Sequence, residues 1–185
     1  GFREPALRGG PAGTMKRLTL IAILLLAPVI TQASGLPPGV MAMDGRPAPA
    51  LKLDNLDGEA YDLAASRGHW VFVHFWASWC GPCRREMPTI QKLTETLQDD
   101  RLEIVMVNTA ETEDEVFSFL GIVAPDIMPL MDTDGLTTEA WQPRGLPATF
   151  LVDPEGHLRY LVLGGREWHT KPYQDFLRGL VGQSS

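Results

Sequence analysis

Residues 76–88 read Trp-Ala-Ser-Trp-Cys-Gly-Pro-Cys-Arg-Arg-Glu-Met-Pro and contain the only two cysteines of the chain, Cys80 and Cys83. They follow an apolar run, Trp70–Trp76, which predicts a strand buried on both faces. They open a segment with helical apolar spacing that extends to about Gln98. A Cys-x-x-Cys pair at a strand-to-helix junction puts the first sulfur at the positive end of a helix dipole, where the thiolate is favoured. The stretch therefore predicts a redox-active dithiol.

Two structural roles for the pair are alternatives to a redox role. A disulfide between Cys80 and Cys83 would close a loop too short to stabilise the fold much by chain entropy. A tetrahedral zinc site would need two more ligands, and the 4 histidines show no ligand spacing. We therefore expect no metal site and no cofactor. Arg84 and Arg85 add positive charge that favours the thiolate.

Composition limits the possible classes of function. A chain of 185 residues suits one domain with a terminal extension. Its formal net charge of −7 and its lack of a Lys/Arg cluster argue against nucleic acid as a partner.

The N-terminal region predicts export. Residues 15–33 combine a basic Met-Lys-Arg start, a short apolar run and a Thr-Gln-Ala end, which is typical of a signal peptide. The apolar run is shorter than the roughly 20 residues that span a bilayer, so a cleaved signal is favoured over an inner-membrane anchor. Residues 1–14 are interpreted as a disordered upstream extension or expression remnant.

The rest of the chain predicts alternating strands and helices. We expect a linker over residues 34–47 and a domain over residues 48–183. The domain begins with a β-hairpin around the Asp57-Gly58 turn. The predicted helix over residues 111–120 turns Val116, Phe117 and Leu120 inward. The other expected elements are strands at 70–76, 102–108, 127–131, 145–153 and 157–165, and helices at about 81–98, 138–141 and 172–181.

Trp79-Cys80-Gly81-Pro82-Cys83 is identical to the active-site signature of the thioredoxin superfamily. Residues 145–150, Gly-Leu-Pro-Ala-Thr-Phe, resemble the loop that carries the cis-proline of that fold. The hairpin, the residues flanking the motif and an inserted strand and helix segment resemble the exported TlpA/ResA-like branch. The resemblance implies an α/β, thioredoxin-like fold, with a mixed central sheet and helices on both faces. It also implies a redox-active Cys80–Cys83 disulfide in which Cys80 attacks, Cys83 resolves and Pro147 lies beside them.

Three further side chains are candidates for supporting roles. His74 stands where cytoplasmic thioredoxins have an acidic residue, and it either shuttles a proton for Cys83 or is a strand histidine held by a local hydrogen bond. Glu86 could modulate the thiol, but a solvated helix face is the commoner place for such a residue, and we expect it there. Trp76 is interpreted as core, whereas Trp79 is expected to recognise partners.

These features predict an exported, periplasmic thiol–disulfide oxidoreductase that reduces disulfides of client proteins. By resemblance, a membrane thiol donor of the DsbD/CcdA type would keep it reduced. Its client would be apocytochrome c, as in cytochrome c maturation, a copper-site protein or another exported thiol enzyme. We expect a monomer. Two alternatives stay open: an oxidase or isomerase that installs disulfides, and a non-enzymatic chaperone that holds Cu(I) between the two thiols. A peroxidase is disfavoured because no separate peroxidatic cysteine exists outside the pair.

Overall fold

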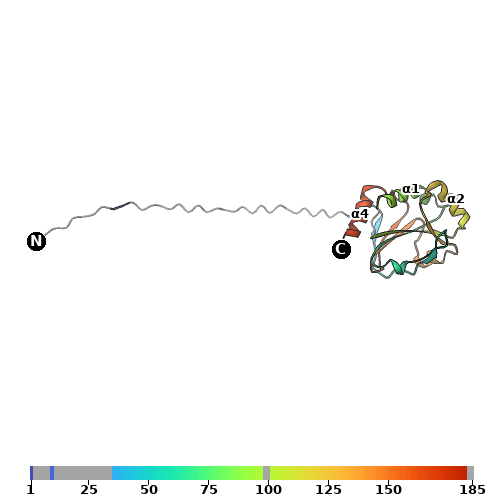
Figure 1. The fold of residues 1–185 in the computed structure, drawn as a ribbon, viewed down its shortest axis with the longest axis horizontal. Coiled ribbons are helices and arrows are strands. Elements are labelled where there is room, and N and C mark those ends of the chain that lie inside the picture. Colours follow the sequence, from blue (N-terminus) through green and yellow to red (C-terminus); the bar gives the residue numbers. More distant parts are fainter. Residues whose placement is uncertain (2–8, 11–34, 98–100, 183–185) are drawn as a thin grey trace. The chain divides into compact units, whose positions relative to one another are not determined.

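The structure is a computed structural model that describes residues 1, 9–10, 35–97 and 101–182 (Figure 1). Contacts group Gly35–Ser185 into one compact unit. The predicted leader, residues 15–33, and nearly all of the predicted extension lie outside the described residues. Among the helices that the structure does describe, none is long and apolar enough to cross a membrane.

A mixed sheet of six strands organises the compact unit, with the order β1-β8-β7-β4-β5-β6. The central strand β4 pairs in parallel with β5 and antiparallel with β7. β5 and β6 are parallel, and β8 runs antiparallel to both β7 and β1. The strands are β1 Val40–Ala42, β4 Trp70–Trp76, β5 Leu102–Thr109, β6 Pro129–Asp132, β7 Ala148–Val152 and β8 Leu158–Leu163.

Helices and a small hairpin cover the two faces of this sheet. Along β4, Phe72 and Trp76 join one core cluster, and Val73 and Phe75 join the other, as the alternation of a strand requires. The first cluster also holds residues of α1 Gly81–Thr96, α2 Glu113–Val123 and α4 Lys171–Gly182. The second is covered by the hairpin β2 Lys52–Asp54 and β3 Ala60–Asp62, the 3-10 turn Leu63–Ser66 and α3 Leu136–Trp141.

The predicted fold class is confirmed, since the central sheet is mixed and helices lie on both faces. The prediction of a strand over residues 70–76 is also confirmed, and every residue of that strand is buried. The predicted hairpin forms as β2 and β3, in a two-stranded sheet separate from the main one.

The structure differs from the predicted linker over residues 34–47. Strand β1 lies inside this range and pairs with β8, and Met43 N–H donates to the Arg159 carbonyl. The segment therefore belongs to the sheet, and the compact unit begins before residue 48. A three-residue strand has too little pattern to be found locally, because its pairing with β8 decides it.

One predicted inward residue of α2 was assigned to the wrong face. Phe117 is 72% exposed, and Phe119 is the buried phenylalanine of that helix.

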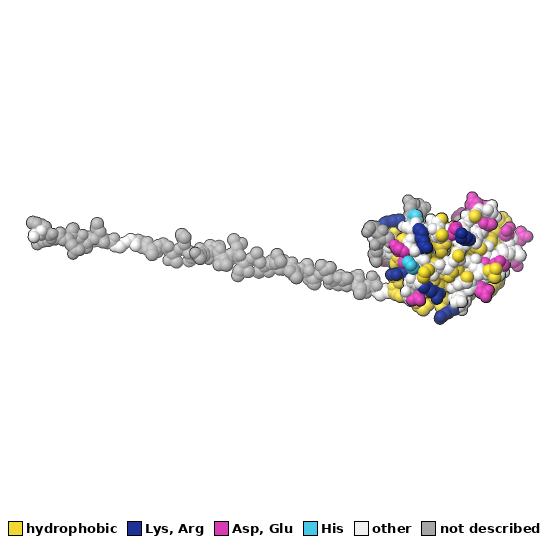
Figure 2. All heavy atoms as spheres, turned by 90° about the horizontal axis from the view of Figure 1, so that it is seen from below, with side chains coloured by type: hydrophobic (Ala, Val, Ile, Leu, Met, Phe, Trp, Pro, Cys, Tyr) yellow, Lys and Arg dark blue, Asp and Glu magenta, His cyan; other side chains and the backbone are white. Residues whose placement is uncertain are grey.

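Figure 2 shows one face of the molecule, on which hydrophobic side chains lie among acidic and basic ones.

Candidate active site

Cys80 and Cys83 form a disulfide at the start of α1, with their Cα atoms 5.2 Å apart. Cys80 is the N-cap residue of the helix, and its Sγ accepts the Cys83 backbone N–H at 3.3 Å. Pro82 lies in the first turn, where its missing N–H leaves no helical bond unmade. Cys80 is 5% exposed, whereas Cys83 is fully buried. Cys80 is therefore the more exposed of the two cysteines.

Three segments meet at the end of the sheet where β4 runs into this motif. Ala148 at the start of β7 pairs with Phe75 near the end of β4, so Pro147, which precedes Ala148, lies at this same end of the sheet. The Leu146–Pro147 peptide bond is cis, as the resemblance implied. A Cβ added at Gly165, just after β8, would lie 3.2 Å from the Pro82 carbonyl oxygen. Only a glycine fits this approach without displacing its neighbour.

A hollow of about 420 Å³ opens beside the motif between α1 and the segment after β8. Its lining includes Pro82 and Arg85 on one side and Gly165 and Arg166 on the other. Trp79, next to Cys80, is 68% exposed, whereas Trp76 is fully buried. The burial of Trp76 confirms its predicted place in the core, and the recognition role of Trp79 stays a prediction.

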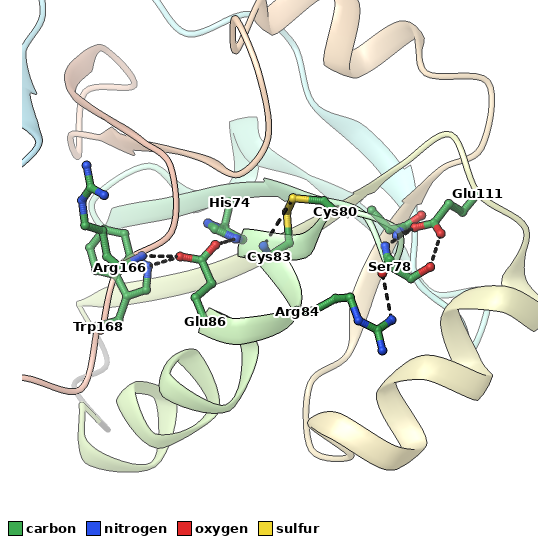
Figure 3. Close-up of a disulfide and its surroundings, with 10 residues drawn as sticks. His74, Ser78, Cys80, Cys83, Arg84, Glu86, Glu111, Arg166 and Trp168 are labelled. Carbon is green, nitrogen blue, oxygen red and sulfur yellow. Dashed lines mark hydrogen bonds and ion pairs between the residues drawn. A yellow bond between two sulfur atoms is a disulfide. The ribbon is translucent and has the colours of Figure 1, made fainter.

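His74 and Glu86 form a buried polar pair beside Cys83 (Figure 3). His74 Nε2 lies 3.1 Å from Glu86 Oε1, which makes an ion pair when the ring is protonated. Its Nδ1 lies 2.8 Å from Thr149 Oγ1 on the neighbouring strand. The histidine is therefore held by a local hydrogen bond, as one of its two predicted roles requires, and it also faces a carboxylate.

The prediction that Glu86 lies on a solvated helix face is wrong, because Glu86 is only 3% exposed. Its Oε2 accepts the Arg166 backbone N–H at 2.8 Å and Trp168 Nε1–H at 3.3 Å. A buried carboxylate needs such donors to offset its lost hydration. The segment that supplies them lies about 80 residues away in sequence, so helical spacing alone could not reveal it.

A second buried carboxylate, Glu111, lies on the opposite side of the disulfide from Glu86 (Figure 3). It accepts hydrogen bonds from both the backbone N–H and the hydroxyl of Ser78. Arg84 donates to the Ser78 carbonyl at 3.0 Å and lies over the Phe119 ring. The sequence analysis did not single out Ser78 or Glu111. The polar Asn108 at the end of an apolar strand was the one signal that a polar partner lies nearby, and Glu111 is that partner.

A disulfide between the N-cap cysteine of a helix and a buried cysteine one turn later, with a cis-proline at the same end of the sheet, defines a thiol–disulfide oxidoreductase of thioredoxin-like fold. The chain belongs to the AhpC/TSA family, whose model matches residues 45–161.

Similar proteins agree with this class. The chain is 32% identical over 121 residues to the thiol-disulfide oxidoreductase ResA of Bacillus subtilis, covering 65% of this chain and 68% of that protein. It is 31% identical over 150 residues to ResA of Halalkalibacterium halodurans, covering 80% and 85%. The solved thioredoxin domain of a thiol-disulfide oxidoreductase from Bacteroides vulgatus superposes with a TM-score of 0.63 at 26% identity, covering 74% and 96%. The predicted relationship to ResA-like oxidoreductases is confirmed.

Proposed function

We propose that this protein is an exported reductase of client-protein disulfides that works through Cys80 and Cys83. The observation that carries the proposal is the disulfide at the N-terminus of α1, in which Cys80 keeps a small exposure and Cys83 is fully buried. The helix N-terminus and the Cys83 N–H favour a thiolate on Cys80 once the disulfide is reduced. The leader-like residues 15–33 support export to the periplasm.

The exchange proceeds in two displacements. The Cys80 thiolate attacks a client disulfide, forms a mixed disulfide and expels one client thiolate. Cys83 then loses its proton and attacks the Cys80 sulfur, which restores the Cys80–Cys83 disulfide and releases the second client thiolate. Two electrons have passed to the client. A membrane thiol donor of the DsbD/CcdA type would return them by the reverse exchange.

The His74–Glu86 pair is our candidate proton acceptor for Cys83. Both side chains are buried near Cys83, and the polar atoms that face each other, His74 Nε2 and Glu86 Oε1, have no other hydrogen-bond partner in the structure. A histidine facing a carboxylate can take up a proton in a buried site, because the carboxylate stabilises the charged ring. In this proposal, the His74–Glu86 pair takes the place of the acidic residue that cytoplasmic thioredoxins have at position 74.

The end of the sheet around Pro147 and the hollow between α1 and the segment after β8 form our candidate client surface. A client segment in extended form could pair with backbone groups beside the cis-proline and place its sulfur over Cys80. Exposed Trp79 would contribute apolar contact area there.

We expect the reduction potential of the purified protein to lie near that of thioredoxin, about −270 mV, or lower. Equilibration with dithiothreitol buffers, followed by separation of the oxidised and reduced forms, measures it. A potential near the roughly −120 mV of strong oxidants would make the protein a disulfide-installing enzyme instead. Tight Cu(I) binding without any reduction of insulin disulfides would favour the chaperone.

Trp79→Ala is expected to lower kcat/KM for reduction of insulin about tenfold, the loss of roughly 1.4 kcal/mol of contact with a protein client. The rate with a small aromatic disulfide should change less than about twofold, because a small substrate makes little contact with this side chain. Phe117→Ala, which removes another exposed aromatic side chain, this one from α2, is the matched control. Equal losses with both substrates would contradict a role in client recognition.

A further inference from the structure

Glu111 is a buried carboxylate for which the proposed exchange has no use. It lies between β5 and α2 and is 6% exposed. Its Oε2 accepts Ser78 N–H at 2.7 Å and Asn108 Nδ2–H at 2.7 Å, and its Oε1 accepts the Ser78 hydroxyl. Burying a carboxylate is costly, so three donors aimed at one group indicate a specific role.

This role is distinct from capping the helix that follows. α2 begins with its own capping box, in which Thr112 and Glu115 satisfy each other's backbone N–H groups. Glu111 therefore directs its oxygens away from α2, toward the strand end at Asn108 and the turn at Ser78.

The Ser78 residue is held from two sides. The Glu111 carboxylate accepts hydrogen bonds from the Ser78 N–H and hydroxyl, and the Arg84 guanidinium donates to the Ser78 carbonyl oxygen at 3.0 Å. Arg84 is itself placed by the Phe119 ring, 4.8 Å from the ring centroid. The peptide units on both sides of Ser78 are thus held by two side chains, Arg84 from α1 and Glu111 from the loop before α2.

The orientation of this turn decides where the Cys80 sulfur lies. Cys80 N–H donates to the Ala77 carbonyl oxygen at 3.2 Å, which closes the turn around Ser78. Cys80 then adopts the extended N-cap conformation that brings Sγ to the Cys83 N–H. A turn free to rotate would move the sulfur away from this donor and from the positive end of the helix, and the thiolate would be less stable.

We propose that Glu111 is a positioning residue for Cys80. Its carboxylate holds the Ser78 turn so that the Cys80 sulfur stays at the N-terminus of α1 and keeps its thiolate character. The inference rests on the proposed function in that Cys80 is the attacking cysteine.

Two substitutions separate the position of the carboxylate from its charge. Glu111→Gln keeps the length, and its amide preserves all three contacts, because the Ser78 hydroxyl can accept where it now donates. Glu111→Asp keeps the charge but is one methylene shorter, so its oxygens withdraw from the Ser78 turn. A positioning role predicts that Glu111→Asp is impaired and Glu111→Gln is not.

The measurement is the alkylation of Cys80 by iodoacetamide in the reduced full-length protein, followed by peptide mass spectrometry across a range of pH. At pH 7 we expect Glu111→Asp to react about fivefold more slowly than wild type, with its pH midpoint raised by up to about one unit. Glu111→Gln should stay within about twofold of wild type. Urea unfolding of the oxidised proteins checks that each variant is folded.

Three outcomes would overturn the proposal: Glu111→Asp reacting as wild type does, Glu111→Gln slowed as much as Glu111→Asp, or Glu111→Gln alone being slowed. Should Glu111→Asp fail to fold, Ser78→Ala takes its place, because it removes the hydroxyl contact and leaves the carboxylate intact. It should slow alkylation about twofold, and a rate equal to wild type would overturn the proposal. Alkylation needs no client, so failure of the proposed client reduction would be seen separately.

Discussion

Replacing Cys80 with alanine is expected to abolish reduction of insulin disulfides, with a loss of about a thousandfold or more. Cys80 is the N-cap of α1 and the only one of the two cysteines with any exposure, so we expect no other thiol to begin the exchange. Turnover with dithiothreitol as the electron donor, corrected for the uncatalysed reaction, measures the loss. Activity that survives at more than a few per cent would contradict the assignment of Cys80 as the nucleophile.

Cys83→Ala is the matched variant, and its expected behaviour is different. The first displacement should still occur, because Cys80 and its position at the helix N-terminus are retained. The second cannot, so the protein should accumulate as a mixed disulfide with the client, visible as a reducible adduct on a non-reducing gel. An adduct formed by Cys80→Ala in place of Cys83→Ala would reverse the two roles.

Glu86→Ala is expected to lower the free energy of unfolding by about 3 kcal/mol. The substitution removes the acceptor of the Arg166 N–H and of Trp168 Nε1–H, and it leaves His74 Nε2 without its polar neighbour. Trp168 and His74 are buried, so water cannot readily replace the carboxylate. Urea unfolding of the oxidised protein, with the slope compared between variants, measures the change.

Two controls make the stability result specific to this buried carboxylate. Glu86→Gln keeps an oxygen for Arg166 and Trp168 and can donate to His74 Nε2, so it should cost less than about 1 kcal/mol. Glu167→Ala removes an exposed glutamate from the neighbouring segment and should change stability by less than about 0.5 kcal/mol. A loss below about 1 kcal/mol in Glu86→Ala would show that the buried network contributes little.

The parts of the fold that the sequence predicted are those with strong local patterns. β4 is apolar at nearly every position, and α1 places Met87, Ile90 and Leu93 on one buried face. The Cys-x-x-Cys motif at their junction is equally local, so the chemistry of the class followed from one stretch of chain. Pro147 could be assigned because its loop resembles that of a known family.

The parts that the sequence missed depend on contacts between distant segments. Spacing along α1 places Glu86 one turn beyond Cys83, but only the segment at Arg166 and Trp168 makes that position buried. The link between Glu111 and Ser78 joins residues 33 positions apart and has no periodic signal. Polar networks of this kind are specified by the tertiary structure, so they become visible only once the strands are in register.

The pairing of β1 with β8 changes where the domain has to be cut. β8 pairs with β7 on one side, and its residues 160–162 pair with β1 on the other. A fragment starting at residue 48 would lose Val40–Ala42 and leave one edge of β8 open. An open edge is a template for intermolecular strand pairing. β1 thus replaces the edge of a six-residue strand with that of a three-residue strand, which is a poorer template for such pairing.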